Sequence, residues 1–307
     1  NAEAWYNYYS ATRALKNIAE DTEILEKYKK QCTVIAEKAY AAVPNTFEGN
    51  HLMWWDLNND ETKRHYLLKA AELAPNDTRA FDDLMIYYKM IRDNENFDTM
   101  CKKIYMNRQL PASLMNWGYN VLSELEPNAI VFVQGDNDTY ALWLVQSVKG
   151  FRSDITIVNT SMMRMNEYRG RTLKELNYPE FNGEYDGLFE FMMKNRKERA
   201  IHVSSSAIRG FNDTPMIDSL YLVGLTYLYC DQPFDNVSII RRNYEKRYLI
   251  DYLSEQFTVH PSDDIAGIFD ALYLPSMIKL YNHYCDSEET SKKKKIEDLM
   301  MKISVKT

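Results

Sequence analysis

The fold is decided by residues 129–159, which read AIVFVQGDNDTYALWLVQSVKGFRSDITIVN. Two short runs in this stretch, 129–134 and 154–159, are rich in β-branched and apolar residues and have the length of buried strands. Between them, the apolar residues of 140–148 recur with the period of an amphipathic helix. A strand, a tight turn, a helix and a second strand form a βαβ unit, which predicts parallel strands and a right-handed crossover.

The α/β pattern continues for about seventy residues beyond this unit, which together make a domain of ordinary size. Helical periods near 167–176 and 188–195 are followed by strand-like runs at 200–205 and 225–230. We therefore predict that residues 128–240 form a small, Rossmann-like domain with a parallel sheet.

Helices are predicted on both sides of this domain. In residues 1–127, the phrase HYLLKAAELAPND at 65–77 resembles the junction between tetratricopeptide repeats, where small residues let two helices close and Pro ends the second. Degenerate repeats of this kind are our interpretation, and an irregular helical bundle is the alternative. The predicted fold class is an α/β insert in a mostly helical protein, with TPR-like hairpins flanking the sheet.

The carboxyl-terminal region, residues 241–307, is predicted to be helical again. Helical periods cover 244–257, 265–285 and 292–303. The four consecutive lysines at 292–295 open the last of these helices, and a run of this kind usually forms a solvated helix face rather than a binding patch.

Composition excludes several classes of protein. Of the 307 residues, 45% are hydrophobic and 26% are charged, which is the balance of a folded globular chain. The net charge of −7 gives no field that attracts nucleic acid, and no segment approaches the ~18 apolar residues of a membrane span. The first residues read like the interior of a helical repeat, so we expect an export signal or lipid anchor to lie outside this sequence.

No cofactor, metal or catalytic set is predicted from motifs. The four cysteines are far apart and have no histidine at zinc-ligand spacing, and the histidines are scattered. The chain lacks a dinucleotide-binding glycine fingerprint, a Walker loop and a serine nucleophile elbow.

One edge of the predicted sheet collects polar residues, because the carboxyl ends of parallel strands share one edge and ligands bind there. A polar turn follows the first strand, and hydroxyl and amide side chains follow the second and third. The candidate ligand-binding residues are Gly135, Asp136, Asn137, Asp138, Thr139, Asn159, Ser161 and Ser205.

The turn at 135–139 has both a structural and a functional interpretation. Gly135 can supply a positive φ angle, and Asp138 or Thr139 can cap the following helix. Capping needs one side chain, whereas two carboxylates and an amide here could also hold a hard cation or sugar hydroxyls. Acid–base catalysis on a sugar linkage needs a second carboxylate at the same edge, and the sequence identifies none.

Residues 129–143, together with Gln146, Arg152, Asp154 and Asn159, resemble a known family. It is the soluble carboxyl-terminal region of bacterial multispanning envelope proteins classed with protein O-mannosyltransferases, and the likeness covers residues 128–230. The resemblance implies an extracytoplasmic domain that accompanies repeat helices. It does not imply glycosyl transfer, because that chemistry is expected in the membrane region of the family.

These observations favour a non-catalytic scaffold of the cell envelope that binds one or more protein partners, in an envelope complex, through TPR-like helices. The expected location is the periplasm or cell envelope, with lipoprotein anchoring as one form of attachment, and neither a nucleic-acid partner nor a transmembrane segment is expected. Two alternatives are centred on the 135–139 turn: a glycan- or divalent-cation-binding domain, and an enzyme that modifies a sugar linkage.

Overall fold

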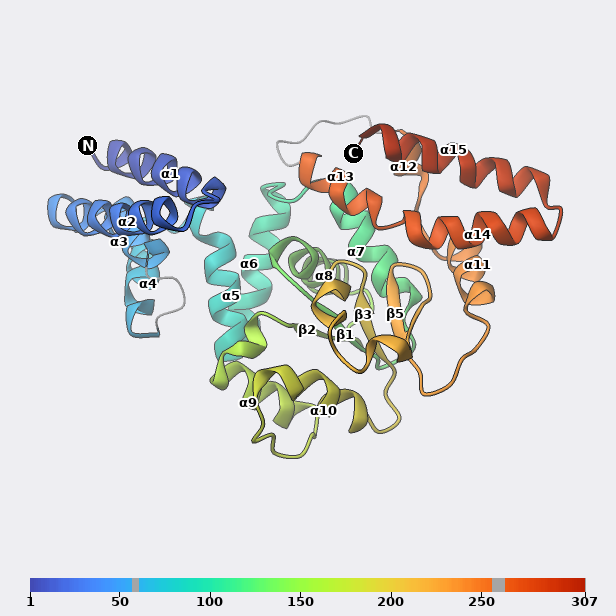
Figure 1. The fold of residues 1–307 in the computed structure, drawn as a ribbon. Coiled ribbons are helices and arrows are strands. Elements are labelled where there is room, and N and C mark those ends of the chain that lie inside the picture. Colours follow the sequence, from blue (N-terminus) through green and yellow to red (C-terminus); the bar gives the residue numbers. More distant parts are fainter. Residues whose placement is uncertain (57–60, 256–262, 307) are drawn as a thin grey trace. The chain divides into compact units, whose positions relative to one another are not determined.

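The computed structural model describes residues 1–56, 61–255 and 263–306 of the chain (Figure 1). They belong to two compact units, residues 1–107 and 108–307. In the described parts, every helix is too short or too polar to cross a lipid bilayer.

The first unit consists of helices that pack as consecutive antiparallel neighbours. The pairs are α1 (Ala2–Ile18) with α2 (Thr22–Ala42), α3 (Phe47–Asp56) with α4 (Arg64–Leu73), and α5 (Phe81–Ile91) with α6 (Asn94–Met106).

Local sequence explains where these helices begin and how they close. The Asp21 carboxylate accepts hydrogen bonds from the first-turn N–H groups of α2, and Asp93 does the same for α6. Small side chains are fully buried where the helices pack, among them Ala36, Ala39 and Ala70. Helices α3 and α5 start 34 residues apart, the period of a tetratricopeptide repeat, and assignment to that repeat stays a prediction.

The second unit contains a five-stranded sheet in the order β2-β1-β3-β5-β4. Its strands are β1 (Ile130–Val133), β2 (Thr156–Asn159), β3 (Ile201–Ser204), β4 (Leu220–Leu222) and β5 (Thr226–Tyr229). Strand β1 pairs in parallel with both β2 and β3, which confirms the predicted βαβ unit.

The predicted fold class, an α/β insert in a mostly helical protein, is confirmed, and the sheet is mixed because one edge is antiparallel. Strand β5 runs antiparallel to β3, and β4, which was not predicted, runs antiparallel to β5. Only three residues separate β4 from β5, and a parallel neighbour would need a crossover of a dozen residues or so. The two strands therefore form a hairpin.

Helices cover both faces of the sheet. Phe132 on β1 packs against Phe189 of α10 (Leu188–Lys194), with ring centroids 5.0 Å apart. The neighbouring positions of β1 point to the other face, where α7 (Ala112–Glu124) packs on α8 (Asp136–Lys149). Helix α9 (Asn166–Glu175) lies with α10 on the lower side of the strands in Figure 1.

The carboxyl-terminal helices differ in their bounds from the predicted ones. They are α11 (Asn236–Lys246), α12 (Asp251–Ser254), α13 (Asp263–Ala271), α14 (Leu274–Asp286) and α15 (Thr290–Lys306). The helix predicted at 244–257 corresponds to α11, which begins at Asn236, because Asp235 caps it, and ends at Lys246. Residues 256–257 lie outside the described ranges. The predicted helix 265–285 is interrupted before Leu274, where Pro275 stands in the first turn of α14.

Helix α7 and the carboxyl-terminal helices belong to the same compact unit as the sheet. The boundary between the compact units lies at residue 107. The domain boundaries predicted at 127 and 240 stay predictions.

Candidate functional site

The candidate site lies at the carboxyl edge of the parallel strands. Strand β1 lies between β2 and β3 in the sheet. The connection after β1 therefore leads to its neighbour on one side, and the connection after β2 leads back past β1 to β3 on the other side. In sheets of this order, the crevice between the carboxyl ends of β1 and β3 is the place where ligands usually bind.

The polar turn predicted at 135–139 is the first turn of a helix. Helix α8 begins at Asp136, and Gly135 is its N-cap residue with a φ of 91°. That backbone conformation favours glycine, and acidic residues suit the positive end of a helix dipole. The expectation that Asp138 or Thr139 caps the helix is wrong, because both residues lie inside it.

Asp138 is the centre of the site and is fully buried. One carboxylate oxygen accepts hydrogen bonds from the Gln134 N–H (2.7 Å) and the Ser206 hydroxyl (2.6 Å). The other accepts from the Thr139 N–H (2.8 Å). Ser206 in turn is 2.6 Å from the Ser204 hydroxyl. The crevice between β1 and β3 is thus bridged by a hydrogen bond within the protein itself.

Thr139 and Asn159 tie the end of β2 to the start of α8. The Thr139 hydroxyl donates to the Gly135 carbonyl oxygen at 2.6 Å. The Asn159 amide donates to the Gly135 carbonyl (3.1 Å) and to the Thr139 hydroxyl oxygen (2.8 Å). Its own carbonyl oxygen accepts from the Met162 N–H at 2.9 Å. Both side chains are therefore engaged in holding the fold.

The remaining predicted residues are outside this cluster. Asp136 and Ser161 are exposed and Asn137 is half-exposed, whereas Asp138 is buried. Ser205 is buried, its N–H donates to the Leu225 carbonyl (2.8 Å), and its hydroxyl has no hydrogen-bond partner.

One further serine after β3, which was not predicted as a site residue, contacts Asp138. The Ser206 hydroxyl donates to Asp138, and the Ser204 hydroxyl contacts Ser206 rather than Asp138. Ser204 is the last residue of β3, and Ser205 and Ser206 lie in the turn that follows it.

The Asp136, Asn137 and Asp138 side chains do not form one cation-binding group, because the Asp138 oxygens are directed inward. Across residues 1–56, 61–255 and 263–306, no three His, Cys, Asp or Glu side chains are arranged to hold a metal ion.

A second buried polar network lies in the same unit, and it was not predicted from the sequence. His202 on β3 lies 2.8 Å from the Thr226 hydroxyl through Nδ1 and 2.6 Å from the Glu126 carboxylate through Nε2. Thr226 donates to Glu124 at 2.5 Å. The one signal in the sequence is a histidine inside an otherwise apolar strand.

Glu124 at the end of α7 is almost completely buried, at 2% exposure. Besides Thr226, its carboxylate accepts from the Leu225 N–H (3.1 Å) and from the Tyr248 hydroxyl. Burial raises the pKa of Glu124 above its usual value, and these hydrogen bonds oppose that rise.

The Thr226–His202–Glu126 sequence of contacts has the order of a nucleophile, a base and an orienting acid. Thr226 is fully buried, however, so its hydroxyl is not presented to a substrate. The network instead joins α7, β3, β5 and the segment after α11.

Residues that carried the family resemblance also hold the fold. Arg152 donates to the carbonyl oxygens of Leu122 and Leu125, both at 2.9 Å, and so caps the end of α7. Its guanidinium is paired with Asp154 at 2.9 Å. Gln146 donates to two carbonyl oxygens just before β2, each at 2.8 Å. Gln146, Arg152 and Asp154 therefore hold neighbouring elements of the second unit together.

Asp138 gives the site a pH dependence that can be measured. Burial is the largest effect on the Asp138 carboxyl and raises its pKa from 3.8 to about 6. A raised pKa in the folded state contributes stability that is present below pH 3.8 and is lost as the pH rises through about 6. The advantage of the wild type over Asp138→Asn in urea unfolding should therefore fall by up to about 3 kcal/mol between about pH 4 and pH 7.

Asp136→Asn is the matched control, since Asp136 lies on the same helical turn and is exposed. Its difference from the wild type should stay nearly constant over that range. A constant difference for Asp138→Asn as well would contradict burial as the cause.

Comparison with known proteins gives one match. Residues 114–178, from α7 to just beyond α9, match the family described as TMEM260-associated domain 2. No curated protein and no solved structure matches the chain. TMEM260 is a protein O-mannosyltransferase, so the match agrees loosely with the resemblance found in the sequence. Over this segment, the chain is similar to a domain associated with TMEM260.

Proposed function

We propose that this chain is a non-catalytic protein of the cell envelope that binds an amphipathic helix of a protein partner. The observation that carries the proposal is an exposed apolar stripe on α1, at the spacing that helices use to pack. The similarity to a TMEM260-associated domain supports an accessory role beside a larger protein.

The α1 stripe consists of Ala4, Tyr8, Ala11, Leu15 and Ile18, spaced alternately by four and three residues. Its large side chains are exposed, by 49% at Tyr8, 44% at Leu15 and 75% at Ile18.

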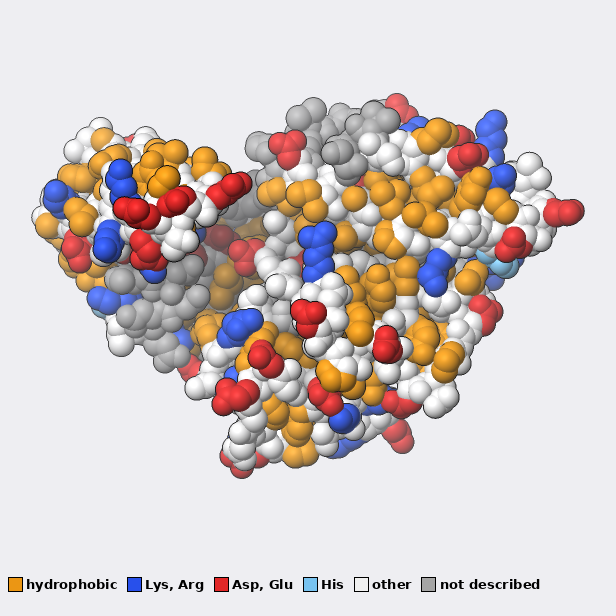
Figure 2. Space-filling view, viewed as in Figure 1, with side chains coloured by type: hydrophobic (Ala, Val, Ile, Leu, Met, Phe, Trp, Pro, Cys, Tyr) orange, Lys and Arg blue, Asp and Glu red, His pale blue; other side chains and the backbone are white. Residues whose placement is uncertain are grey.

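Helix α2 extends this apolar surface. Ile24 and Val34 are exposed by 47% and 45%, and the Gln31 amide donates to the Tyr8 hydroxyl oxygen at 2.9 Å, which places the two helices' faces side by side. Of the twelve large apolar side chains exposed in the described residues, eight lie in residues 1–107, so this unit is the better candidate for binding. Figure 2 shows hydrophobic side chains gathered over α1 and α2.

A helical partner fits this surface better than an extended peptide. Apolar residues spaced by four and three form the seam along which two helices pack, and an amphipathic helix bound in a groove presents the same pattern. Sheet augmentation would instead need a free strand edge.

The carboxyl edge of the parallel strands supports the non-catalytic part of the proposal. Its buried carboxylate, Asp138, is held by three hydrogen bonds of 2.6–2.8 Å and joins α8 to the segment after β3. A general acid or base needs an oxygen within reach of the substrate.

The test is a pull-down from envelope extracts with the purified chain and its Leu15→Lys/Ile18→Lys variant. Loss of a central apolar contact costs roughly 2 kcal/mol or more, so the variant should retain at least about 30-fold less of the partner. The partner should be identified by mass spectrometry, and helical peptides from it should bind the wild type in solution.

Met106→Lys serves as the control, because Met106 is also exposed, at 77%, but lies outside the α1 stripe. It should retain the partner fully. Equal loss in both variants, or capture of the same proteins by Leu15→Lys/Ile18→Lys and wild type, would reject binding through this stripe.

A further inference from the structure

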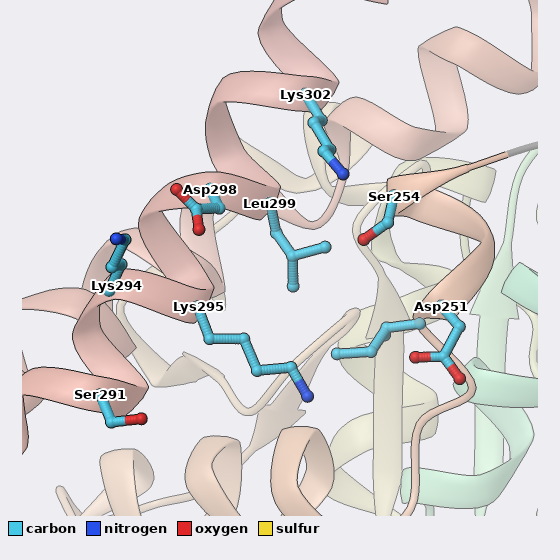
Figure 3. A pocket seen from close by; sticks show the side chains of 9 residues that line it. Asp251, Ser254, Ser291, Lys294, Lys295, Asp298, Leu299 and Lys302 are labelled. Carbon is cyan, nitrogen blue, oxygen red and sulfur yellow. The ribbon is translucent and has the colours of Figure 1, made fainter.

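A pocket of about 350 Å³ lies between α12 and α15 in the second unit (Figure 3). Its lining is of two kinds. The apolar part is formed by Ile250 and Leu299, which are 7% and 4% exposed. The polar part includes the Ser254 and Ser291 hydroxyls and the ammonium groups of Lys295 and Lys302.

The lysines of α15 differ in their partners. Lys292 is neutralised by Glu289 at 2.6 Å and by Glu245 at 3.0 Å. Within the part of the chain that the structure describes, Lys294, Lys295 and Lys302 form no ion pair, although all three line the pocket. The basic run therefore contains cations that no acidic side chain of the described residues neutralises.

Two of these lysines, Lys295 and Lys302, line the pocket from one face of α15. Lys295 and Lys302 lie seven residues apart, about two turns of helix, and so stand on the same face of α15. Figure 3 shows Lys295 extending across the pocket and Lys302 directed toward Ser254.

Two carboxylates also line the pocket, Asp251 and Asp298. In Figure 3 the Asp298 carboxylate lies at the outer margin beside Lys294, rather than between Lys295 and Lys302. Three ammonium groups against two carboxylates leave the lining positively charged.

We propose that this pocket binds a small organic anion. The charged head group, a phosphate or a carboxylate, lies at the end of the pocket where Lys302 is directed toward Ser254, and accepts hydrogen bonds from both. Lys295 adds positive charge at the other end. A short apolar part of the ligand covers Ile250 and Leu299. This assignment depends on neither the α1 stripe nor the site at the carboxyl edge of the parallel strands.

The experiment is a calorimetric titration of the full chain with three probes of equal chain length: hexyl phosphate, hexanoate and hexanol. At least one of the two anions should bind saturably, and hexanol should not. The anion that binds more tightly identifies the head group. Lys295→Gln/Lys302→Gln should weaken anion binding by at least about tenfold, since charge-assisted hydrogen bonds are lost.

Lys293→Gln is the control for overall charge. It removes a positive charge from the same helix, but the Lys293 ammonium lies over the Tyr281 ring at 5.3 Å and does not line the pocket. The control should bind as the wild type does. Absence of saturable binding for both anions, or weakening by Lys293→Gln as large as that by the double variant, overturns the proposal.

Discussion

Gly224→Ala is expected to destabilise the second unit by about 3–5 kcal/mol, which is enough to unfold many domains of this size. Gly224 lies in the turn between β4 and β5, where a methyl group would overlap the Glu124 carboxylate and the Tyr248 hydroxyl. Both groups are buried and hydrogen-bonded to each other, so neither can move aside without losing its partners. Thermal and urea unfolding of the purified variant measure the effect.

Gly170→Ala is the control for this substitution. Gly170 lies within α9, and a methyl group there would meet no atom within 4 Å. This variant should be neutral or more stable by up to about 1 kcal/mol, because alanine favours helix. Wild-type stability in Gly224→Ala would show that the turn is not packed as described.

Glu124→Ala is expected to cost about 3–5 kcal/mol. The substitution removes the acceptor of the Thr226 and Tyr248 hydroxyls and of the Leu225 N–H, all of them buried. Each buried donor left without an acceptor costs about 1–3 kcal/mol, and the cavity adds to this. Chemical unfolding monitored by tryptophan fluorescence should show an earlier transition for the second unit.

Glu126→Ala tests the same network from its solvent side. The Glu126 side chain is 41% exposed and its loss leaves one buried nitrogen of His202 without a partner, so it should cost about 1–2 kcal/mol, less than the loss of Glu124, which leaves three buried donors. Equal effects of Glu124→Ala and Glu126→Ala would contradict the assignment of Glu124 as the buried centre of the network.

The parts of the fold predicted from sequence are those with a strong local period. Residues 129–159 predicted β1, α8 and β2 because two apolar runs enclose a helical period, and β3 followed from the apolar run at 200–205. Strand β4 was not predicted, since a strand of three residues has almost no period. The direction of β5 was not predicted either. Pairing direction was decided by the three-residue connection between them.

The position of the candidate site in the chain follows from the pattern of strands, but the surroundings of its side chains were only partly predictable. Pattern alone placed Asp138, Asn159 and the serines after β3 at one edge of the sheet. Whether a carboxylate there faces solvent or the interior depends on where α8 begins, and the difference of four residues turned Asp138 inward. Glu124 was missed because its partners are 101–124 residues away in sequence.

That sequence distance has a consequence for biosynthesis. Helix α7 leaves the ribosome long before β5 and Tyr248 are made, so the contacts of Glu124 form only after these later residues have been synthesised. Until residues 226–229 arrive, the outer edge of β3 has no neighbour, and an open strand edge invites pairing with other chains. A nascent or truncated chain that stops before this hairpin is thus the form of the protein most exposed to aggregation and most dependent on chaperones.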